Sequence, residues 1–575
     1  MNPSAARTLD HQRNDQSAAA VWSGSDFVTG QVEFHDQRIN AKAQSEGALA
    51  AWRLALSEDP SLVASCAYGD FAVGIGDGQG KTVLAVDRFG IQSLCYRIVD
   101  GRLRFAPQAD QLADPDHPLD TQAIYDYLYF HAIPSPRTIY QGIFRLPPGH
   151  VAVFEQGRLT VEPYWTPSFE PAGGRSFEDL RDEFRQVLRD AVQRQLGNGR
   201  PACFLSGGTD SSTVAGMIRA VTGEAPASYS IGFEAEGYDE MAYARIAARH
   251  FGTEHHEYYV TAEDLLAGIP LAAAAFDQPF GNSSALPTWC CARMAQDDGV
   301  TRLLAGDGGD ELFGGNSRYA KQRIFGWYDK VPGLLRRGLM EPLLMGTPLG
   351  RLPLARKGAS YVEQARVPMP DRMQSYNLLC RLGHEDVLSA AFLAQVDRDE
   401  PLAQQRSVWA ACAAPDELNR NLAFDWRYTL AESDLPKVRM ATALAGVDVG
   451  FPLLDRRLLE FSQRLPTDYK LRGLKLRWFF KEALRGFLPD EIITKQKHGF
   501  GLPFGVWANR HPKLSVFAAD SVRGLADRGV LRHEFVETLL RERLPENPGY
   551  YGEMVWISMM LEQWLRHHAP NFKVR

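Results

Sequence analysis

Residues 204–217, FLSGGTDSSTVAGM, combine an apolar run, a pair of glycines and a segment that can start a helix. A strand that delivers the Ser-Gly-Gly segment 206–208 into a helix starting near Ser212 would turn several backbone N–H groups towards one point. Such a nest at a helix N-terminus binds phosphate. Asp210 would repel a phosphate on its own, so its natural role is to hold a Mg²⁺ ion that bridges phosphate oxygens. The stretch therefore predicts a cradle for pyrophosphate.

A plain glycine-rich turn would explain the two glycines, but it would leave Asp210 and the two serines that follow it without a role. A second stretch, LLAGDGGDELFGG at 303–315, also follows an apolar run and is rich in glycine and acidic residues. Loops that leave neighbouring parallel strands meet at the carboxyl edge of the sheet, where open α/β folds bind ligands. We therefore expect Asp310 to be the second Mg²⁺ ligand.

These two loops need a parallel sheet to bring them together. From residue 200 onwards, strand-like and helical segments alternate, at 202–206, 213–223, 227–233, 240–252 and 255–260. This rhythm is typical of βαβ units and predicts a parallel sheet with helices on both faces. Beyond about residue 320 the sequence is mainly helical in pattern. The predicted fold of this part is an α/β parallel-sheet domain with a large helical C-terminal region.

The N-terminal part has a different pattern. Up to about residue 165 it consists of short strand-like runs separated by turns, which predicts an α+β domain of paired sheets. Residues 167–177, PSFEPAGGRSF, are typical of a linker, so we expect domains at 1–166 and 178–575. The stretch GIGDGQGKT at 74–82 is similar to a P-loop but has Ile75 where a glycine is required, and a hairpin turn is the simpler interpretation.

Length, composition and charge limit the class of protein. At 575 residues the chain exceeds what one hydrophobic core usually supports. A net charge of -7 without a long Lys/Arg run gives no footprint for a nucleic-acid backbone. Neither a signal-like N-terminal segment nor a membrane-spanning apolar run is found, so we expect a cytoplasmic protein with no membrane partner. The 7 scattered cysteines form no CxxC pair and indicate reduced structural thiols.

Five motifs together resemble those of the asparagine synthetase family of ATP-pyrophosphatase-type amide ligases. They are SGGTDS at 206–211, YSIGF at 229–233, GDGGDELFGG at 306–315, FPLLD at 451–455 and KQKHGFGLPFGVW at 495–507. The family's glutaminase domain is similar to three further segments: GDFAVGI at 69–75, AVDRFGIQSLCYR at 85–97 and RLPPGHVAVF at 145–154. The resemblance covers nearly the whole chain and implies a glutaminase-like, Ntn-type sandwich followed by the amide ligase domain.

This resemblance also implies a reaction: ATP is cleaved between its α- and β-phosphates, a carboxylate becomes an acyl-adenylate, and a nitrogen nucleophile displaces AMP. Lys497 takes the position of the family's essential lysine, which stabilises developing charge, although a surface lysine is the alternative. Asp307 and Asp448 stand where relatives carry groups proposed as the base. Backbone groups of Leu205 and Ile231 would flank the adenine. The implied ATP-binding residues are Leu205, Ser206, Gly207, Gly208, Asp210, Ser211, Ser212, Ile231 and Gly306, and the implied Mg²⁺ ligands are Asp210 and Asp310.

The N-terminal part departs from the family pattern. Glutamine-dependent members carry a cysteine after the initial methionine, and its own α-amino group activates the thiol. This sequence has Asn2 at that position, and its first cysteine is Cys66. The RxSI and NGEIYN segments that would bind glutamine are also absent from the first 45 residues. We therefore expect a retained scaffold without glutaminase chemistry.

Three functions fit this pattern. The chain could make asparagine from aspartate and ammonia, free or derived from glutamine; it could condense an amine within its own substrate; or it could be an inactive binding relative. β-Lactam-forming synthetases have a tyrosine where this chain has Asp307. An aspartate suits an ordinary α-amine better than that tyrosine. The preferred interpretation is a lasso-peptide macrolactam synthetase, whose partners would be a precursor peptide and a leader-peptide protease. Aromatic stretches at 323–330 and 547–556 could line a wide cleft for a peptide, or simply pack between helices.

Overall fold

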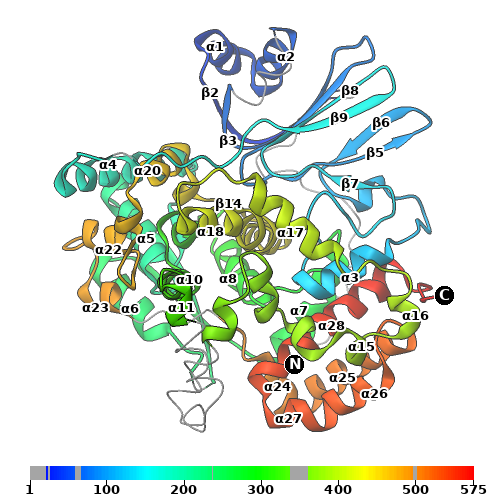
Figure 1. The fold of residues 1–575 in the computed structure, drawn as a ribbon. Helices are drawn as coiled ribbons and strands as arrows, with labels where there is room; N and C mark the ends of the chain where they lie inside the picture. Colours follow the sequence, from blue (N-terminus) through cyan, green and yellow to red (C-terminus); the bar gives the residue numbers. More distant parts are fainter. Residues whose placement is uncertain are drawn as a thin grey trace, which may run out of the picture.

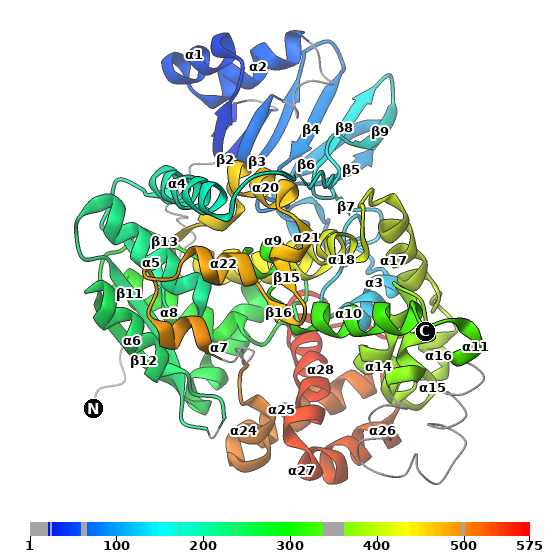
Figure 2. The same cartoon turned by 60° about the vertical axis from the view of Figure 1, so that its left-hand side comes forward.

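The computed structural model describes residues 21–23, 26–58, 66–171, 173–235, 237–336, 361–495 and 501–575. Asn2 and Lys497 lie outside these ranges. A strand-rich N-terminal part stands on a larger body, which is formed by a parallel sheet and many helices (Figures 1 and 2).

The N-terminal part contains two antiparallel sheets and two covering helices. The larger sheet has the order β1-β2-β3-β4-β8-β9, and the smaller sheet has the order β6-β5-β7. The larger sheet comprises β1 (Val21–Ser23), β2 (Asp26–Phe34), β3 (Ala67–Gly76), β4 (Thr82–Val86), β8 (His150–Glu155) and β9 (Arg158–Pro163). The smaller sheet comprises β5 (Cys95–Val99), β6 (Arg102–Ala106) and β7 (Phe144–Arg145), and the helices are α1 (Gln37–Glu46) and α2 (Ala48–Glu58).

Strand β3 is apolar on both faces because each face meets a different layer. The Phe71 ring lies 5.1 Å from the Trp52 ring of α2. The next residue, Ala72, points the other way and shares a buried cluster with residues of the smaller sheet. The layers are so close that a Cβ atom on Gly74 would collide with the Phe105 ring. The predicted pairing of two sheets is therefore confirmed.

The glycine-rich stretch 74–82 forms a turn between two antiparallel strands. Gly76 at the end of β3 pairs with Thr82 at the start of β4. Between them, the Asp77 carboxylate accepts hydrogen bonds from the backbone N–H groups of Gln79 and Lys81, at 2.7 and 3.0 Å. The hairpin prediction is confirmed, and the similarity to a P-loop is superficial.

The central sheet of the larger body is parallel throughout and has the order β12-β11-β10-β13-β14. The chain steps outwards from β10 to β12 and then returns to the other side of β10 to form β13. Strand order therefore reverses between β10 and β13, which brings the two glycine loops to the same carboxyl edge. The predicted parallel α/β sheet is confirmed. Its strands are β10 (Ala202–Phe204), β11 (Ala227–Phe233), β12 (Glu254–Val260), β13 (Arg302–Leu304) and β14 (Asp448–Gly450).

Helices accompany this sheet, and α4 shows how the sequence specifies them. The Ser176 hydroxyl caps its start by accepting the Asp179 N–H over 3.1 Å. Leu180, Phe184 and Leu188 recur at helical spacing and are buried. The helices of this part are α4 (Phe177–Gln195), α5 (Thr209–Thr222), α6 (Met241–Phe251), α7 (Ala262–Ala275), α8 (Ala285–Asp297) and α9 (Gly309–Phe313).

The rest of the chain is mainly helical, as predicted. Residues Met554–Leu565 of α28 (Pro548–His568) are buried, which places this helix inside the region. Within the described ranges, no helix is long and apolar enough to span a bilayer. Its other helices are α10 (Ser317–Asp329), α11 (Gly333–Leu335), α14 (Leu378–Leu382), α15 (His384–Val387), α16 (Ala390–Leu393), α17 (Glu400–Ala411), α18 (Glu417–Asp425), α19 (Leu435–Leu444), α20 (Arg456–Arg464), α21 (Thr467–Lys470), α22 (Trp478–Ala483), α23 (Asp490–Thr494), α24 (Phe504–Arg510), α25 (Pro512–Asp527), α26 (His533–Thr538) and α27 (Leu544–Glu546). Shorter elements are the 3₁₀ turns η1 (Asp110–Leu112), η4 (Asp371–Tyr376) and η6 (Pro452–Leu454), the π-helices η5 (Trp426–Asp434) and η7 (Leu539–Arg543), and the hairpin of β15 (Leu471–Arg472) and β16 (Lys475–Leu476).

The N-terminal part and the helical region share buried contacts. Helix α3 (Thr121–Phe130) precedes the predicted linker, yet the Tyr127 hydroxyl donates to a backbone carbonyl of α28 over 2.9 Å. In the linker segment 167–177, Phe169 is buried, with its ring 5.2 Å from that of Trp426. The first half of the linker is thus packed against the helical region. The boundaries 1–166 and 178–575 remain a prediction.

One buried carboxyl of the N-terminal sandwich should make its stability depend on pH. Burial, and then the neighbouring Asp87, raise the pKa of Asp70 from 3.8 to about 7. Asp70 Oδ2 accepts a hydrogen bond from Gln92 over 3.1 Å, whereas Oδ1 has no partner among the described residues. Between pH 3.8 and about 7, the folded chain retains a proton that the unfolded chain releases, so the free energy of unfolding falls as pH rises.

We predict that Asp70→Asn raises the melting temperature at pH 8 and flattens its decline between pH 5 and 8. The gain should be on the order of 1 to 3 kcal/mol, the cost of an unsatisfied buried polar group. Thermal melts across this pH range would measure it. Asp77→Asn is the matched control: hydrogen bonds from Gln79 and Lys81 lower the pKa of Asp77, so this variant should gain nothing. A lower melting temperature for Asp70→Asn at pH 8 would contradict the prediction.

Candidate active site

A cavity of ≈ 690 Å³ opens at the carboxyl ends of β10 and β13, where the strand order reverses. Its walls come from the loops after these strands, the start of α5, helices α8 and α19, and the segment from β16 to α22. Acidic side chains outnumber basic ones in this lining, among the residues that the structure describes. The acidic ones are Asp210, Glu240, Asp307, Asp310, Glu311 and Asp434, and the basic ones are Lys437, Arg477, Lys481 and Lys495.

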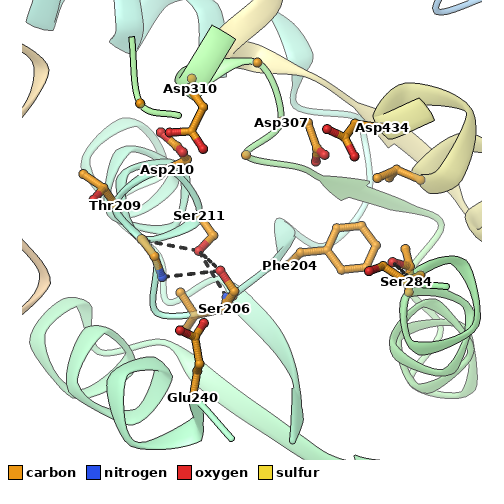
Figure 3. A pocket seen from close by; sticks show the side chains of 18 of the residues that line it. Phe204, Ser206, Thr209, Asp210, Ser211, Glu240, Ser284, Asp307, Asp310 and Asp434 are labelled. Atoms are coloured by element: carbon orange, nitrogen blue, oxygen red, sulfur yellow. Dashed lines mark hydrogen bonds between the residues drawn. The ribbon is translucent and has the colours of Figure 1, made fainter. Parts of the chain in front are cut away.

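The loop after β10 folds over the first turn of α5. The Ser206 N–H donates to the Ser211 hydroxyl over 3.1 Å, and the two hydroxyls lie 3.0 Å apart (Figure 3). Gly208 is the N-cap of α5, and no side chain caps this helix. The positive end of the helix dipole and the N–H groups of its first turn are therefore well placed for an anion.

The two glycine loops touch each other. A Cβ atom on Gly306 would lie 2.8 Å from the backbone nitrogen of Ser211, so a larger residue would force the loops apart. Gly308 has a φ of 99°, a region that favours glycine, and a Cβ atom there would collide with a methyl group of Leu454. Glycine at these positions is thus needed for the close approach.

The carboxylates of Asp210 and Asp310 both bind the guanidinium group of Arg477. Figure 3 shows their carboxylates side by side, one from α5 and the other from α9. The Arg477 guanidinium donates to Asp210 Oδ2 over 2.8 Å and to Asp310 Oδ1 over 2.7 Å. A left-handed backbone at Arg477, with a φ of 54°, directs this buried side chain into the cavity. Burial lowers the pKa of Lys481, which also lines the cavity, and Arg477 lowers it further.

This carboxylate pair fits a divalent cation. Magnesium prefers oxygen ligands and is commonly bound by one or two carboxylates together with phosphate oxygens. The Asp210 and Asp310 oxygens face one point at the mouth of the anion-binding helix, and acidic residues exceed basic ones around them. No cluster of three or more His, Cys, Asp or Glu occurs in the described ranges, so phosphate and water would have to complete the coordination.

A second acidic pair faces the cavity from the opposite side. Lys437 Nζ lies 3.3 Å from both Asp307 Oδ1 and Asp434 Oδ1. Figure 3 shows these two carboxylates next to each other, away from Asp210. Burial raises the pKa of the Asp307 carboxyl, and Lys437 opposes that rise. Asp307 is therefore a partly buried carboxyl group next to one ammonium group, an arrangement that can accept a proton.

Leu205 and Ile231 both line the cavity, as predicted for the adenine side. The backbone groups of Leu205 already have partners in the sheet, however. Its N–H donates to the Tyr229 carbonyl over 2.9 Å, and its carbonyl accepts from the Ser230 hydroxyl. β11 thus uses the Leu205 N–H, and the adenine contact predicted for the backbone of Leu205 stays a prediction. Its carbonyl retains a second lone pair.

Most of the predicted site residues lie in this cavity. Those that line it are Leu205, Ser206, Gly208, Asp210, Ser211, Ile231, Gly306, Asp307 and Asp310. Gly207 and Ser212 are not among the lining residues, and their part in ATP binding stays a prediction. A Cβ atom on Gly207 would lie 2.6 Å from the Tyr243 side chain, so Gly207 serves packing against α6. Ser212 is fully buried within α5, because it lies one position beyond the residues of the first turn that face the cavity.

Asp448 lies at the other edge of the sheet. It is the first residue of β14, and its carboxylate forms an ion pair with Arg302, the first residue of β13. Strand β14 runs parallel to β13, so its first residue lies at the amino edge, whereas the cavity is at the carboxyl edge. The prediction that Asp448 acts as base is therefore corrected. Asp434 is the acidic residue that the structure places next to Asp307.

Three further residues of the cavity wall, Lys437, Arg477 and Lys495, carry weak signals in the sequence. Lys437 is a single lysine within an apolar segment of α19, which is a recognisable sign of a buried charge. Arg477 follows a two-residue strand and has no local pattern that marks it. Lys495 pairs with Glu240 over 3.1 Å at the cavity wall, two positions before Lys497.

Comparisons with known proteins agree with this geometry. The asparagine synthase family model matches residues 183–566, and a glutamine amidotransferase domain model matches residues 31–165. "Asparagine synthetase [glutamine-hydrolyzing] 1" of Bacillus subtilis is 23% identical over 556 residues, which cover 95% of this chain and 84% of that protein. "Putative asparagine synthetase [glutamine-hydrolyzing]" of Mycobacterium bovis is 26% identical over 467 residues, covering 76% and 68%.

We predict that Gly309→Ala weakens nucleotide binding by at least about tenfold. A Cβ atom at this position would lie 2.6 Å from the Asp210 carboxyl carbon and 3.0 Å from the Arg477 guanidinium, so the convergent carboxylates must move apart. Calorimetric titration with a non-hydrolysable ATP analogue and Mg²⁺ would measure the change. Gly326→Ala is the matched control, because Gly326 lies in α10 with its nearest neighbour 3.6 Å away. Equal affinity in wild type and Gly309→Ala would contradict the prediction.

Proposed function

The chain belongs to the asparagine synthase family of ATP-dependent amide-forming ligases, and on this premise we propose that it joins an adenylated carboxylate to an amine within one peptide. A carboxylate oxygen attacks the α-phosphorus of ATP, the bond to the β-phosphate oxygen breaks, and pyrophosphate leaves. The amine nitrogen then attacks the acyl carbon, loses a proton and displaces AMP. The products are the amide, AMP and pyrophosphate.

The observation that carries this proposal is the convergence of the two glycine loops on one basic group. The start of α5 supplies N–H donors for the leaving pyrophosphate, and Arg477 supplies positive charge at the same point. A Mg²⁺ ion held by Asp210 and Asp310 would add further charge neutralisation for the phosphates. Arg477, released from the carboxylates by that ion, can turn its donors to the pyrophosphate oxygens.

Asp307 has the features of a base for the attacking amine. Burial raises the pKa of its carboxyl group, which makes the carboxylate a stronger base, and the Lys437 ammonium at 3.3 Å opposes that rise. Asp434 shares Lys437 and can stabilise the ammonium that develops on the nucleophile. Lys497 remains a prediction for stabilising the acyl transfer step.

The amine source decides between macrolactam formation and asparagine synthesis. The sequence has Asn2 where glutamine-dependent members of the family carry the cysteine that hydrolyses glutamine. This supports an amine that arrives with the substrate rather than ammonia generated within the chain. Binding amine and carboxylate in one molecule can supply an effective concentration of roughly 10⁵ M or more. Asparagine formation from aspartate and ammonia is the second candidate, and the names of the relatives favour it.

We predict that the purified chain releases AMP and pyrophosphate from ATP when Mg²⁺, hydroxylamine and a carboxylate substrate are present. The panel of carboxylates should include aspartate, glutamate and aspartyl and glutamyl peptides. Asp210→Asn, Asp310→Asn and Lys497→Ala should each lower the rate by about 100- to 1000-fold, as is typical for a lost electrostatic stabiliser. Asp448→Asn should retain most activity, because Asp448 faces the opposite edge of the sheet. Normal turnover in soluble Lys497→Ala would remove that residue from the mechanism.

We further predict that the natural product is an intramolecular amide. Short peptides encoded beside the gene, incubated with the chain, ATP and Mg²⁺, should lose the mass of one water and resist N-terminal sequencing. Mass spectrometry would measure both. Efficient conversion of aspartate and ammonium to asparagine, with every candidate peptide unchanged in mass, would replace this proposal by the ammonia-dependent synthetase.

A further inference from the structure

A second cavity, of ≈ 430 Å³, lies beside the candidate active site. Its walls come from the C-terminal end of α3, from α14, from η5 and from the start of α28. Figure 2 shows α3, α14 and α28 gathered on one side of the molecule. The volume falls within the range of small-molecule sites.

The π-helix η5 forms part of the wall between the two cavities. Glu432 and Ser433 line the second cavity, and the next residue, Asp434, lines the first. Asn282 of the first cavity donates to the Ser433 hydroxyl over 3.1 Å. π-Helical turns are frequent at functional sites. A molecule in the second cavity would therefore lie next to Asp434 and its neighbour Asp307, the acidic pair that faces the amine.

Aromatic rings dominate the wall of the second cavity. The Phe130 and Tyr428 rings are stacked, with centres 5.5 Å apart and planes 11° apart. Phe424 lies 4.9 Å from the Tyr428 ring, and the Tyr550 ring lies 5.0 Å below the Arg381 guanidinium. Phe130 remains partly exposed, so its ring is available to a ligand. Such a wall favours a planar, apolar group.

Two buried polar atoms of this wall, the Tyr129 hydroxyl oxygen and Gln405 Oε1, have no hydrogen-bond partner among the described residues. Gln405 is only 6% exposed. Buried carboxamide oxygens are almost always hydrogen-bonded, so this one indicates an N–H donor on a ligand. Several charged groups of the wall are paired: Glu432 with Arg145 and Arg427, and Arg318 with Asp425. The cavity thus offers aromatic faces, the Gln405 carboxamide oxygen and the Tyr129 hydroxyl.

We propose that the second cavity binds the amine-bearing part of the substrate, through an aromatic ring packed against Phe130 and an N–H group donated to Gln405. This inference rests on the proposed amide-forming function, and it names the amine as a peptide-like molecule with an aromatic side chain. Ammonia would have no use for such a cavity. The amine enters beside Asp434 and reaches the acyl carbon in the first cavity.

Binding of a defined probe tests this inference without requiring catalysis. L-Phenylalaninamide carries a ring, a primary amine and amide N–H groups, and L-alaninamide lacks only the ring. Calorimetric titration of the full chain should give at least about tenfold tighter binding for L-phenylalaninamide. Phe130→Ala and the near-isosteric Gln405→Leu should each weaken this binding by about tenfold or more. Phe144→Ala is the matched control. Phe144 lies on β7, next to Tyr96 of β5, and its partly exposed ring is outside the cavity.

The same proteins are assayed for AMP release with hydroxylamine, a nucleophile too small to need the second cavity. Retained AMP release with lost probe binding in Phe130→Ala and Gln405→Leu supports the inference. Equal affinity for the two probes, or probe binding unchanged in both variants while AMP is still released, overturns it and leaves the proposed function intact. Absence of AMP release from the wild type overturns the proposed function and with it the role of the cavity. If either Phe130→Ala or Gln405→Leu fails to fold, the test uses the variant that does fold.

Discussion

The Arg477 guanidinium lies between the carboxylates of Asp210 and Asp310, and the organisation of the candidate active site depends on this contact. Two carboxylates this close would repel each other without a shared cation. Each comes from the loop after a different strand, so the cation also holds the two loops together. Gly306 and Gly309 then provide the space in which the loops can meet. A divalent ion with a nucleotide would take over the same charge balance.

Charge is distributed across the cavity in two groups with different chemistry. Near α5, Arg477 and Lys481 add to the positive end of the helix, which suits a leaving pyrophosphate. On the other side, burial raises the pKa of Asp307 and Lys437 opposes that rise, which suits proton transfer. Activation of the carboxylate and attack by the amine can therefore take place in one cavity, with a separate group of residues for each step. The aromatic second cavity lies on the amine side of this division.

The N-terminal sandwich is part of the same structural unit as the ligase region. Helix α3 follows the strands of the sandwich in sequence, yet it packs on α28 and contributes Phe130 to the second cavity. These contacts give the N-terminal part a structural role that does not depend on glutaminase chemistry. Its removal would expose the buried face of α28 and open the wall of the amine-side cavity.

The sequence alone determined the features that depend on local spacing. Glycine pairs after apolar runs specified both loops, alternation of strands and helices specified the parallel sheet, and Ile75 correctly excluded a P-loop at the β3–β4 turn. Tertiary structure decided the rest, because it depends on strand direction and on contacts between distant residues. Asp448 is adjacent in sequence to a family motif, but the parallel direction of β14 places it at the amino edge. Arg477 contacts Asp210, which is 267 positions away in the sequence, and its own backbone is left-handed. No local sequence pattern encodes this contact.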